Sequence, residues 1–190
     1  MRRVFCATWM ASTLLLSMPS LADDFYDTIK AGKLQGKLIV QWIEPDVFLF
    51  LPDKQSPLSF TRFDGQQIVP QRMLTDGGSV PRPFWILRNY SPWGYAPAFI
   101  VHDWLYEKNH CKYPGHDQMS VHDAAMVMAE VMKTMMESKK VPVDRLTVWS
   151  MHTAVTTSIA QSYWDGGKCN PPPAGLNSIK PIFEYTIEFP

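Results

Sequence analysis

The sequence predicts an α+β fold in which a small N-terminal antiparallel β-sheet precedes a bundle of about three helices. Residues 36–75 contain β-branched and aromatic runs that are interrupted by turn residues, as is typical of short strands. Residues 97–166 place apolar side chains at helical spacing. Between them, residues 76–97 are rich in glycine, proline and aromatic side chains, which indicates an ordered but irregular loop.

Proline and glycine divide the first region into four predicted strands. The turn between the third and fourth strands is predicted at Asp64-Gly65. One more strand is expected in residues 182–187, within a proline-rich tail that covers residues 168–190. The four strands of the first region are expected at residues 38–40, 47–51, 58–63 and 67–73.

Three helices are predicted after the irregular loop. The first covers residues 97–109, and the second runs from an N-cap at Ser120 to about Ser138. The third begins near Pro142, a residue suited to the first turn of a helix, and ends at Gly166. The methionines of the second helix are expected to fill the core, because Met adapts to irregular gaps.

The first 22 residues are interpreted as a cleavable signal peptide. Two arginines precede an apolar stretch from Val4 to Met18, and Ser20-Leu21-Ala22 forms a cleavage pattern of small residues. The apolar stretch is shorter than the roughly 20 residues that a membrane-spanning helix needs. We therefore expect a mature domain of residues 23–190, exported to the periplasm or secreted, without a transmembrane segment.

Charge and cysteine content narrow the possible partners. Removal of residues 1–22 takes away two arginines and no acidic residue, which leaves a net charge of −2. Without a basic stripe, nucleic acid is not expected as a partner. Two cysteines remain, Cys111 and Cys169, and in an oxidising compartment they are expected to form a disulfide.

A group of reactive side chains lies on the first two predicted helices. His102 and Asp103 are neighbours in sequence, so on a helix they point roughly 100° apart and serve different faces. Tyr106 follows within one turn and can flank both. If the next helix is antiparallel, Asp123 approaches His102 and holds it as a general base in one tautomer. The predicted catalytic residues are therefore His102, Asp123 and Tyr106.

A cation site is predicted beside this group. Asp76 and Asp103 supply carboxylates, and the flexible Gly77 can turn its backbone carbonyl toward an ion. These oxygen ligands suit calcium. Structural interpretations of the same residues remain open: Asp76 before two glycines can be a turn, His102 a satisfied core residue, and Asp123 a carboxylate at a helix N-terminus.

The sequence does not favour a zinc site or a serine nucleophile in this region. Zinc ligands usually come as tightly spaced pairs, and only one cysteine accompanies the histidines of this region. Ser79 is not in the G-x-S-x-G context of a hydrolase nucleophile. The residues considered for zinc were His110, Cys111, His116, His122 and Asp123.

Several motifs in this order resemble a bacterial and phage family known as domain of unknown function 1353. They are TDGGSVPRPFW at 75–85, Gly94-Tyr95, HDWLY at 102–106 and HDAAM at 122–126. The resemblance covers residues 36–167. It departs from the family pattern at His122, where alanine is common.

A more distant resemblance connects the same motifs with bacterial secreted phospholipase A2. It implies that His102 activates water, that Asp123 orients His102, and that calcium lies between Asp76, Asp103 and the Gly77 carbonyl. Calcium would polarise the ester carbonyl and stabilise the oxyanion. The chain departs from those enzymes in having Gly78 at the place of a disulfide-bonded cysteine, and its β-rich N-terminal part has no counterpart.

Together these features lead to the expectation of an exported, calcium-assisted hydrolase that acts on membrane phospholipid or another ester or amide of the cell envelope. Aromatic side chains near the motifs are expected to bind the substrate, namely Trp85, Tyr95 and Trp104. The alternative is a structural or binding module of the envelope or of phage origin. In that case the same polar residues form a buried network that fixes loop and helix geometry.

Overall fold

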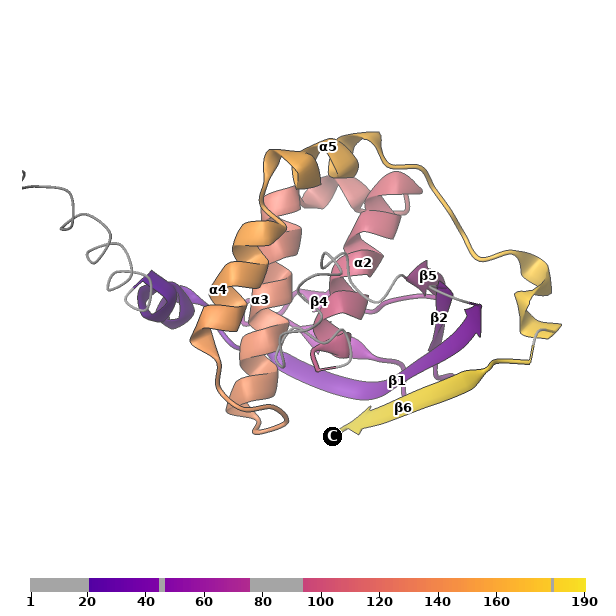
Figure 1. Cartoon of the computed structure of the whole chain (residues 1–190), viewed down its shortest axis with the longest axis horizontal. Coiled ribbons are helices and arrows are strands. Elements are labelled where there is room, and N and C mark those ends of the chain that lie inside the picture. Colours follow the sequence, from indigo (N-terminus) through magenta and orange to yellow (C-terminus); the bar gives the residue numbers. More distant parts are fainter. Residues whose placement is uncertain (1–20, 45–46, 76–93, 179) are drawn as a thin grey trace, which may run out of the picture.

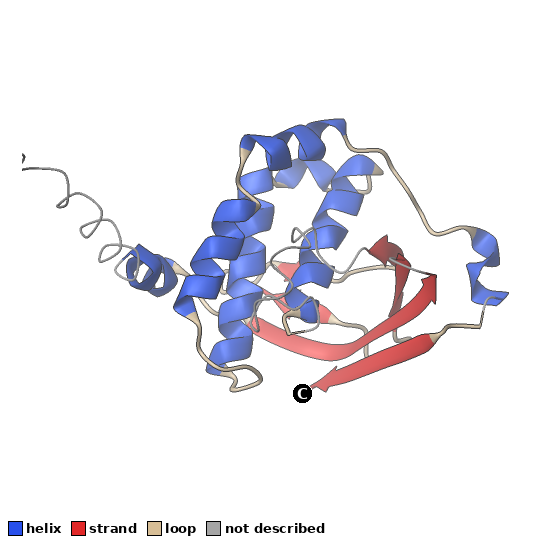
Figure 2. Ribbon diagram, in the orientation of Figure 1, coloured by secondary structure: helices blue, strands red, loops and turns tan. Residues whose placement is uncertain are grey.

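The computed structural model describes residues 21–44, 47–75, 94–178 and 180–190. It confirms an α+β fold, with helices lying against one side of a curved antiparallel sheet (Figures 1 and 2). The strands are β1 (Lys33–Glu44), β2 (Val47–Pro52), β3 (Ser59–Thr61), β4 (Gln67–Ile68), β5 (Met73–Thr75) and β6 (Phe183–Phe189).

Strand β1 is the centre of the sheet, whose order is β4-β3-β1-β2-β5 with β6 also paired to β1. Along one edge, β1 changes partner at Gly36: Gln35 pairs with Ser59 of β3, and Gly36 pairs with Phe189 of β6. Gly36 has a φ of +90°, and a Cβ there would strike the Pro57 backbone, so only glycine suits this position. The prediction of a sheet confined to the N-terminal region is therefore incomplete. The C-terminal strand β6, which overlaps the strand expected at residues 182–187, pairs with β1 and completes the sheet.

The helices of the second region are α2 (Ala96–His110), α3 (Val121–Glu137), α4 (Arg145–Ala154) and α5 (Ser158–Gly166). The first two match the predicted ranges closely. The third predicted helix is divided into α4 and α5, because Thr157 starts a new helix by accepting a hydrogen bond from the Ala160 N–H at 3.3 Å. Short 3₁₀ turns follow α2 and α5, at His116–Gln118 and Ala174–Ser178.

The core lies between the sheet and α3. Met128, Met132 and Met136 of α3 are almost completely buried, as expected for core-filling methionines. They pack with aromatic and aliphatic side chains from the inner face of the sheet. The largest of these are Leu38, Phe50, Phe60 and Met73.

Residues 21–28 form a helix that was not predicted, and it docks onto α3 and α4. Tyr26 and Ile29 are buried, and the Lys133 ammonium donates hydrogen bonds to their carbonyl oxygens at 2.9 and 3.0 Å. The predicted cleavage point after Ala22 falls inside this helix, while residues 1–20 lie outside the described part of the chain. No helix among the described residues is long and apolar enough to cross a membrane.

The predicted disulfide is present between Cys111 and Cys169, whose Cα atoms are 4.5 Å apart. It joins the C-terminal end of α2 to the segment that follows α5. Because this segment leads into the tail that returns to the sheet as β6, the bond fixes where the tail leaves the helical layer (Figure 1).

Candidate functional site

A cavity of about 600 Å³ lies between α2, α5 and the ends of β2 and β5. We call it the His102 cavity. Its polar wall comes mainly from α2 and β5 and contains Thr75, His102, Asp103, Tyr106, Glu107 and His110. Its apolar wall contains Val47, Leu74, Val155, Ile159 and Ala160. A mixed lining of this kind suits a small ligand that has both a polar and a hydrocarbon part.

His102 is the most buried polar residue of α2, with 7% of its surface exposed. Its Nε2 atom is buried and has no hydrogen-bond partner among the described residues. Its Nδ1 atom lies 3.7 Å from Asp103 Oδ1, which is too long for a hydrogen bond. A buried ring nitrogen without a partner is uncommon in folded proteins and calls for a physical explanation.

Asp103 connects the helix to the sheet. Its Oδ2 atom accepts a hydrogen bond of 2.6 Å from the Thr75 hydroxyl at the end of β5. The carboxylate is therefore held in place by a buried donor, while its other oxygen faces the His102 ring.

Tyr106 lies one turn after His102, with the two ring centroids 4.9 Å apart. Burial raises the pKa of the Tyr106 phenol to about 12, and the negative charge of Asp103 contributes to the shift. The hydroxyl is therefore neutral over the physiological range and can act as a hydrogen-bond donor. Its ring packs edge-on against Trp164 of α5, with centroids 4.8 Å apart, which fixes its direction.

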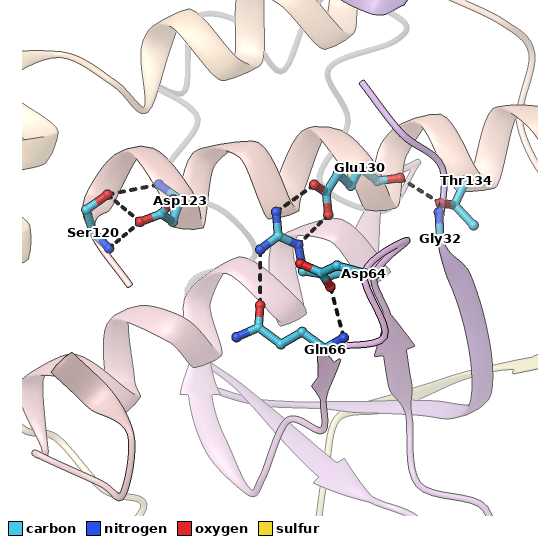
Figure 3. A network of polar contacts seen from close by, with 8 residues as sticks. Gly32, Asp64, Gln66, Ser120, Asp123, Glu130 and Thr134 are labelled. Atoms are coloured by element: carbon cyan, nitrogen blue, oxygen red, sulfur yellow. Dashed lines mark hydrogen bonds and ion pairs between the residues drawn. The ribbon is translucent and has the colours of Figure 1, made fainter. Parts of the chain in front are cut away.

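Asp123 does not join this group. Its side chain is exposed, and its Oδ2 atom accepts hydrogen bonds from the Ser120 backbone N–H at 2.8 Å and the Ser120 hydroxyl at 2.7 Å (Figure 3). The Ser120 hydroxyl in turn accepts from the Asp123 N–H, which completes a capping box. These hydrogen bonds hold the pKa of the Asp123 carboxyl below its usual value.

The predicted His102–Asp123 pair is therefore not formed, since no hydrogen bond or ion pair joins these two described residues. The stagger of the helices explains the difference. His102 lies eight residues before the end of α2, about 12 Å along its axis, whereas Asp123 is in the first turn of the antiparallel α3. Asp123 therefore lies nearer the level of the C-terminal end of α2 than that of His102.

The remaining predicted residues have separate places. Trp104 lies on the opposite side of α2, where its ring stacks with Tyr113 at 5.6 Å, so it does not line the His102 cavity. Tyr95 is buried in the core at the N-cap of α2. The predicted metal ligands Asp76 and Gly77 and the predicted substrate contact Trp85 lie outside the described residues.

One cluster among the described residues has the composition of a metal site, Glu107 with Cys111 and Cys169, and both of its sulfur atoms are engaged in the disulfide. Because Cys111 is oxidised in this disulfide, it cannot bind zinc as a thiolate. His110 is also engaged, with its Nε2 atom 3.0 Å from the Tyr163 carbonyl oxygen.

Glu107 lines the His102 cavity but was not predicted as a site residue, and His110, which also lines it, was a candidate for zinc alone. Burial raises the pKa of the Glu107 carboxyl. The sequence contains a signal for His110, because His102, Tyr106 and His110 are each four residues apart and therefore share one face of a helix. This spacing alone predicts that one face of α2 supplies much of the polar wall.

Comparison with known proteins places these elements in a family. Residues 55–155, which include α2, α3 and the polar wall of the His102 cavity, match the family described as Protein of unknown function (DUF1353). The chain matches no curated protein and no solved structure. The matched segment covers more than half of the chain, and the chain therefore belongs to the DUF1353 family.

Proposed function

We propose that this protein is an exported hydrolase that cleaves an ester of envelope material, with phospholipid as its substrate class and His102 as its general base. One observation carries the proposal. The His102 Nε2 atom is buried and has no hydrogen-bond partner among the described residues, and His102 lines a cavity that has both polar and apolar sides. A satisfied core histidine would have both ring nitrogens hydrogen-bonded.

The chemistry requires three groups from α2. The neutral His102 imidazole takes a proton from a water molecule as the water oxygen attacks the ester carbonyl. Tyr106, neutral up to a pKa of about 12, can donate a hydrogen bond to the oxyanion that forms. Asp103 is the carboxylate beside the imidazole, with its Oδ1 atom 3.7 Å from Nδ1, and its negative charge lies next to the positive charge that forms on the ring during proton transfer. The imidazolium then returns its proton to the leaving alcohol.

Calcium is part of the proposal. Asp103 would hold it together with Asp76 and the Gly77 carbonyl, which follow Thr75 directly in the sequence. Of these three, Asp103 is the one in the described part of the chain, and its carboxylate is a suitable hard ligand. When bound, calcium supplies a Lewis acid for the ester carbonyl.

The apolar wall supports a substrate with a hydrocarbon part. Val155, Ile159 and Ala160 lie opposite the polar residues of α2, and Ile159 is 80% exposed. An acyl chain that covered Ile159 would remove this apolar surface from water, which is favourable in proportion to the area buried.

Release of fatty acid from mixed phospholipid vesicles, with and without calcium, tests the proposal. We expect His102→Ala and His102→Gln to lower the rate at least 100-fold, the usual contribution of general-base catalysis. His122→Ala, at an exposed histidine of α3, is the matched control and should retain the wild-type rate. Thermal unfolding of each variant shows whether the fold is retained. Unchanged release by a folded His102→Gln protein would remove His102 from the mechanism.

A non-catalytic module is the second candidate, supported by the Thr75–Asp103 hydrogen bond, which joins strand β5 to helix α2. In that case the polar residues fix the position of α2 on the sheet. It predicts that no ester is hydrolysed with or without calcium, and that substitutions of Thr75 and Asp103 lower stability without any other effect.

A further inference from the structure

A second cavity, of about 530 Å³, lies on the opposite side of α2 from the His102 cavity. We call it the Tyr113 groove. Trp104 and Lys108 face it from α2, while Tyr113 and Gln118 come from the loop before α3. Gln67 and Arg72 line it from the sheet side. None of the described residues that line it serves the proposed hydrolysis.

The charged side chains among the described residues of the Tyr113 groove are all positive. Lys108 and Arg72 line it, and no acidic side chain in the described ranges does. Neither cation forms an ion pair with another described residue. The Lys108 ammonium and the Gln118 amide oxygen come together over Gly115, where an added Cβ would lie 3.2 and 3.0 Å from them. The groove therefore offers an unpaired ammonium beside an amide.

Arg72 has further hydrogen-bonding capacity. Its two terminal nitrogens contact the carbonyl oxygens of Pro172 and Pro173 at 3.3 and 3.4 Å, which is longer than usual for such bonds. Its Nε atom is buried and has no hydrogen-bond partner among the described residues. A carboxylate bound in the groove beside Arg72 could add shorter, charge-assisted hydrogen bonds to this guanidinium.

Aromatic and amide groups complete the lining. The Tyr113 ring, which is partly exposed, stacks on the buried Trp104 at 5.6 Å, so it is a supported flat surface. The side chains of Gln67, Gln71 and Gln118 are exposed along the groove and provide both donors and acceptors. Such a surface matches a ligand with one flat apolar face and several hydroxyl groups.

From these three features we infer that the Tyr113 groove binds an acidic saccharide, that is, a sugar that carries a carboxylate. Lys108 and Arg72 would bind the carboxylate, and the glutamine amides would form hydrogen bonds with the hydroxyl or acetamido groups. The Tyr113 ring would pack against the apolar face of the sugar ring. A nucleic acid strand would satisfy the cations, but a chain with zero formal net charge lacks the extended basic surface it requires.

Isothermal titration calorimetry on the full mature chain tests this inference. The probes are a disaccharide of N-acetylglucosamine and N-acetylmuramic acid, digalacturonate, and the neutral di-N-acetylchitobiose, which differs from the first in lacking the lactyl carboxylate. Sodium lactate tests the anion alone. We expect the acidic disaccharides to bind at least tenfold more tightly than either the neutral sugar or lactate, since a hydrogen bond to a charged group contributes roughly that factor.

Variants assign the binding to the groove. Lys108→Gln and Tyr113→Ala should each weaken the acidic disaccharides about tenfold, whereas Lys54→Gln, at an exposed lysine elsewhere, should leave binding unchanged. His102→Gln should also bind normally, so failure of the hydrolase proposal does not affect this result. Equal affinity for the acidic and neutral sugars, no measurable binding of either, or wild-type binding by folded Lys108→Gln and Tyr113→Ala proteins would overturn the inference.

Discussion

Thr75 and Asp103, which are 28 residues apart in the sequence, share a hydrogen bond of 2.6 Å that joins the last residue of β5 to the middle of α2. Thr75 is 7% exposed, so its hydroxyl meets the carboxylate away from bulk water. This bond sets the distance between the sheet and the helix that carries His102, Tyr106 and His110. The polar wall of the His102 cavity therefore depends on it.

Thr75→Val should lower the free energy of unfolding by about 2 kcal/mol, because it removes a donor to a partly buried carboxylate while keeping the side-chain volume. Urea denaturation measures the change. Thr75→Ser keeps the hydroxyl and serves as the control, with a smaller loss that reflects the missing methyl group. Equal stability of the valine variant and the wild type would show that the bond contributes nothing.

Ser120→Ala should cost about 1 kcal/mol of stability, since it removes the side-chain half of the capping box of α3. The capping hydrogen bonds lower the pKa of Asp123 in the folded chain, so its contribution is complete above about pH 4 and is lost as the pH falls through the folded value. The difference between wild type and variant should therefore shrink below pH 4. A constant difference from pH 7 to pH 2 would contradict this assignment.

Asp123→Asn separates the capping role from the role predicted from the sequence. If Asp123 only caps α3, this variant should hydrolyse any substrate at the wild-type rate, because the carboxylate is exposed and does not contact His102. Asp103→Asn, at the carboxylate beside His102, is the comparison and should be impaired. A large loss of rate in a stable Asp123→Asn protein would restore the predicted dyad.

Glu130 is 2% exposed and receives two hydrogen bonds of 2.7 Å from the Arg62 side chain, in a network that Figure 3 shows along α3. Glu130→Gln should destabilise the protein by about 3 kcal/mol, because it leaves a partly buried guanidinium without its counter-charge. Replacing both residues by methionine should cost much less. Chemical unfolding of the single and double variants distinguishes these effects, and a double variant as unstable as the single one would contradict the argument.

Alkaline stability should depend on Tyr106. Between about pH 10 and pH 12 an unfolded chain ionises this phenol, whereas the folded chain keeps it neutral because its pKa is raised to about 12. The unfolded state then binds fewer protons, so stability decreases as the pH rises through this range. Tyr106→Phe should make the decrease less steep than in the wild type, as measured by unfolding at pH 9, 10 and 11. An identical slope in the two proteins would show that folding does not raise the pKa of Tyr106.

The parts of the fold that the sequence predicts well carry local signals. Helix α3 has a serine N-cap and a regular apolar stripe, and both its start and its end are within one residue of the prediction. The division between α4 and α5 was missed because the apolar pattern continues across it, while the new cap at Thr157 resembles an ordinary helix residue. The helix at 21–28 was missed because it overlaps the predicted cleavage site of the signal peptide.

The candidate site, too, could be predicted within one helix but not between two helices. His102, Asp103 and Tyr106 were found because their spacing within one helix determines which of them are neighbours. The pairing with Asp123 failed because it depended on the offset between two helices, and the length of the connecting loop does not determine that offset. Similarly, Trp104 lies away from the His102 cavity because of its angular position on α2. Its predicted role in substrate binding was based on its closeness to the motifs in the sequence, which does not determine that position.

The central position of β1 has a consequence for how the family is delimited. Residues 55–155 match the family, yet β1 ends at residue 44 and provides the edges on which β2, β3 and β6 assemble. A fragment limited to the matched segment would keep α2, α3 and α4, but it would lose β1 together with β2 and β6, which pair with it, and also α5, which lines the His102 cavity. The stretch in which relatives are recognisable is therefore smaller than the stretch that can fold.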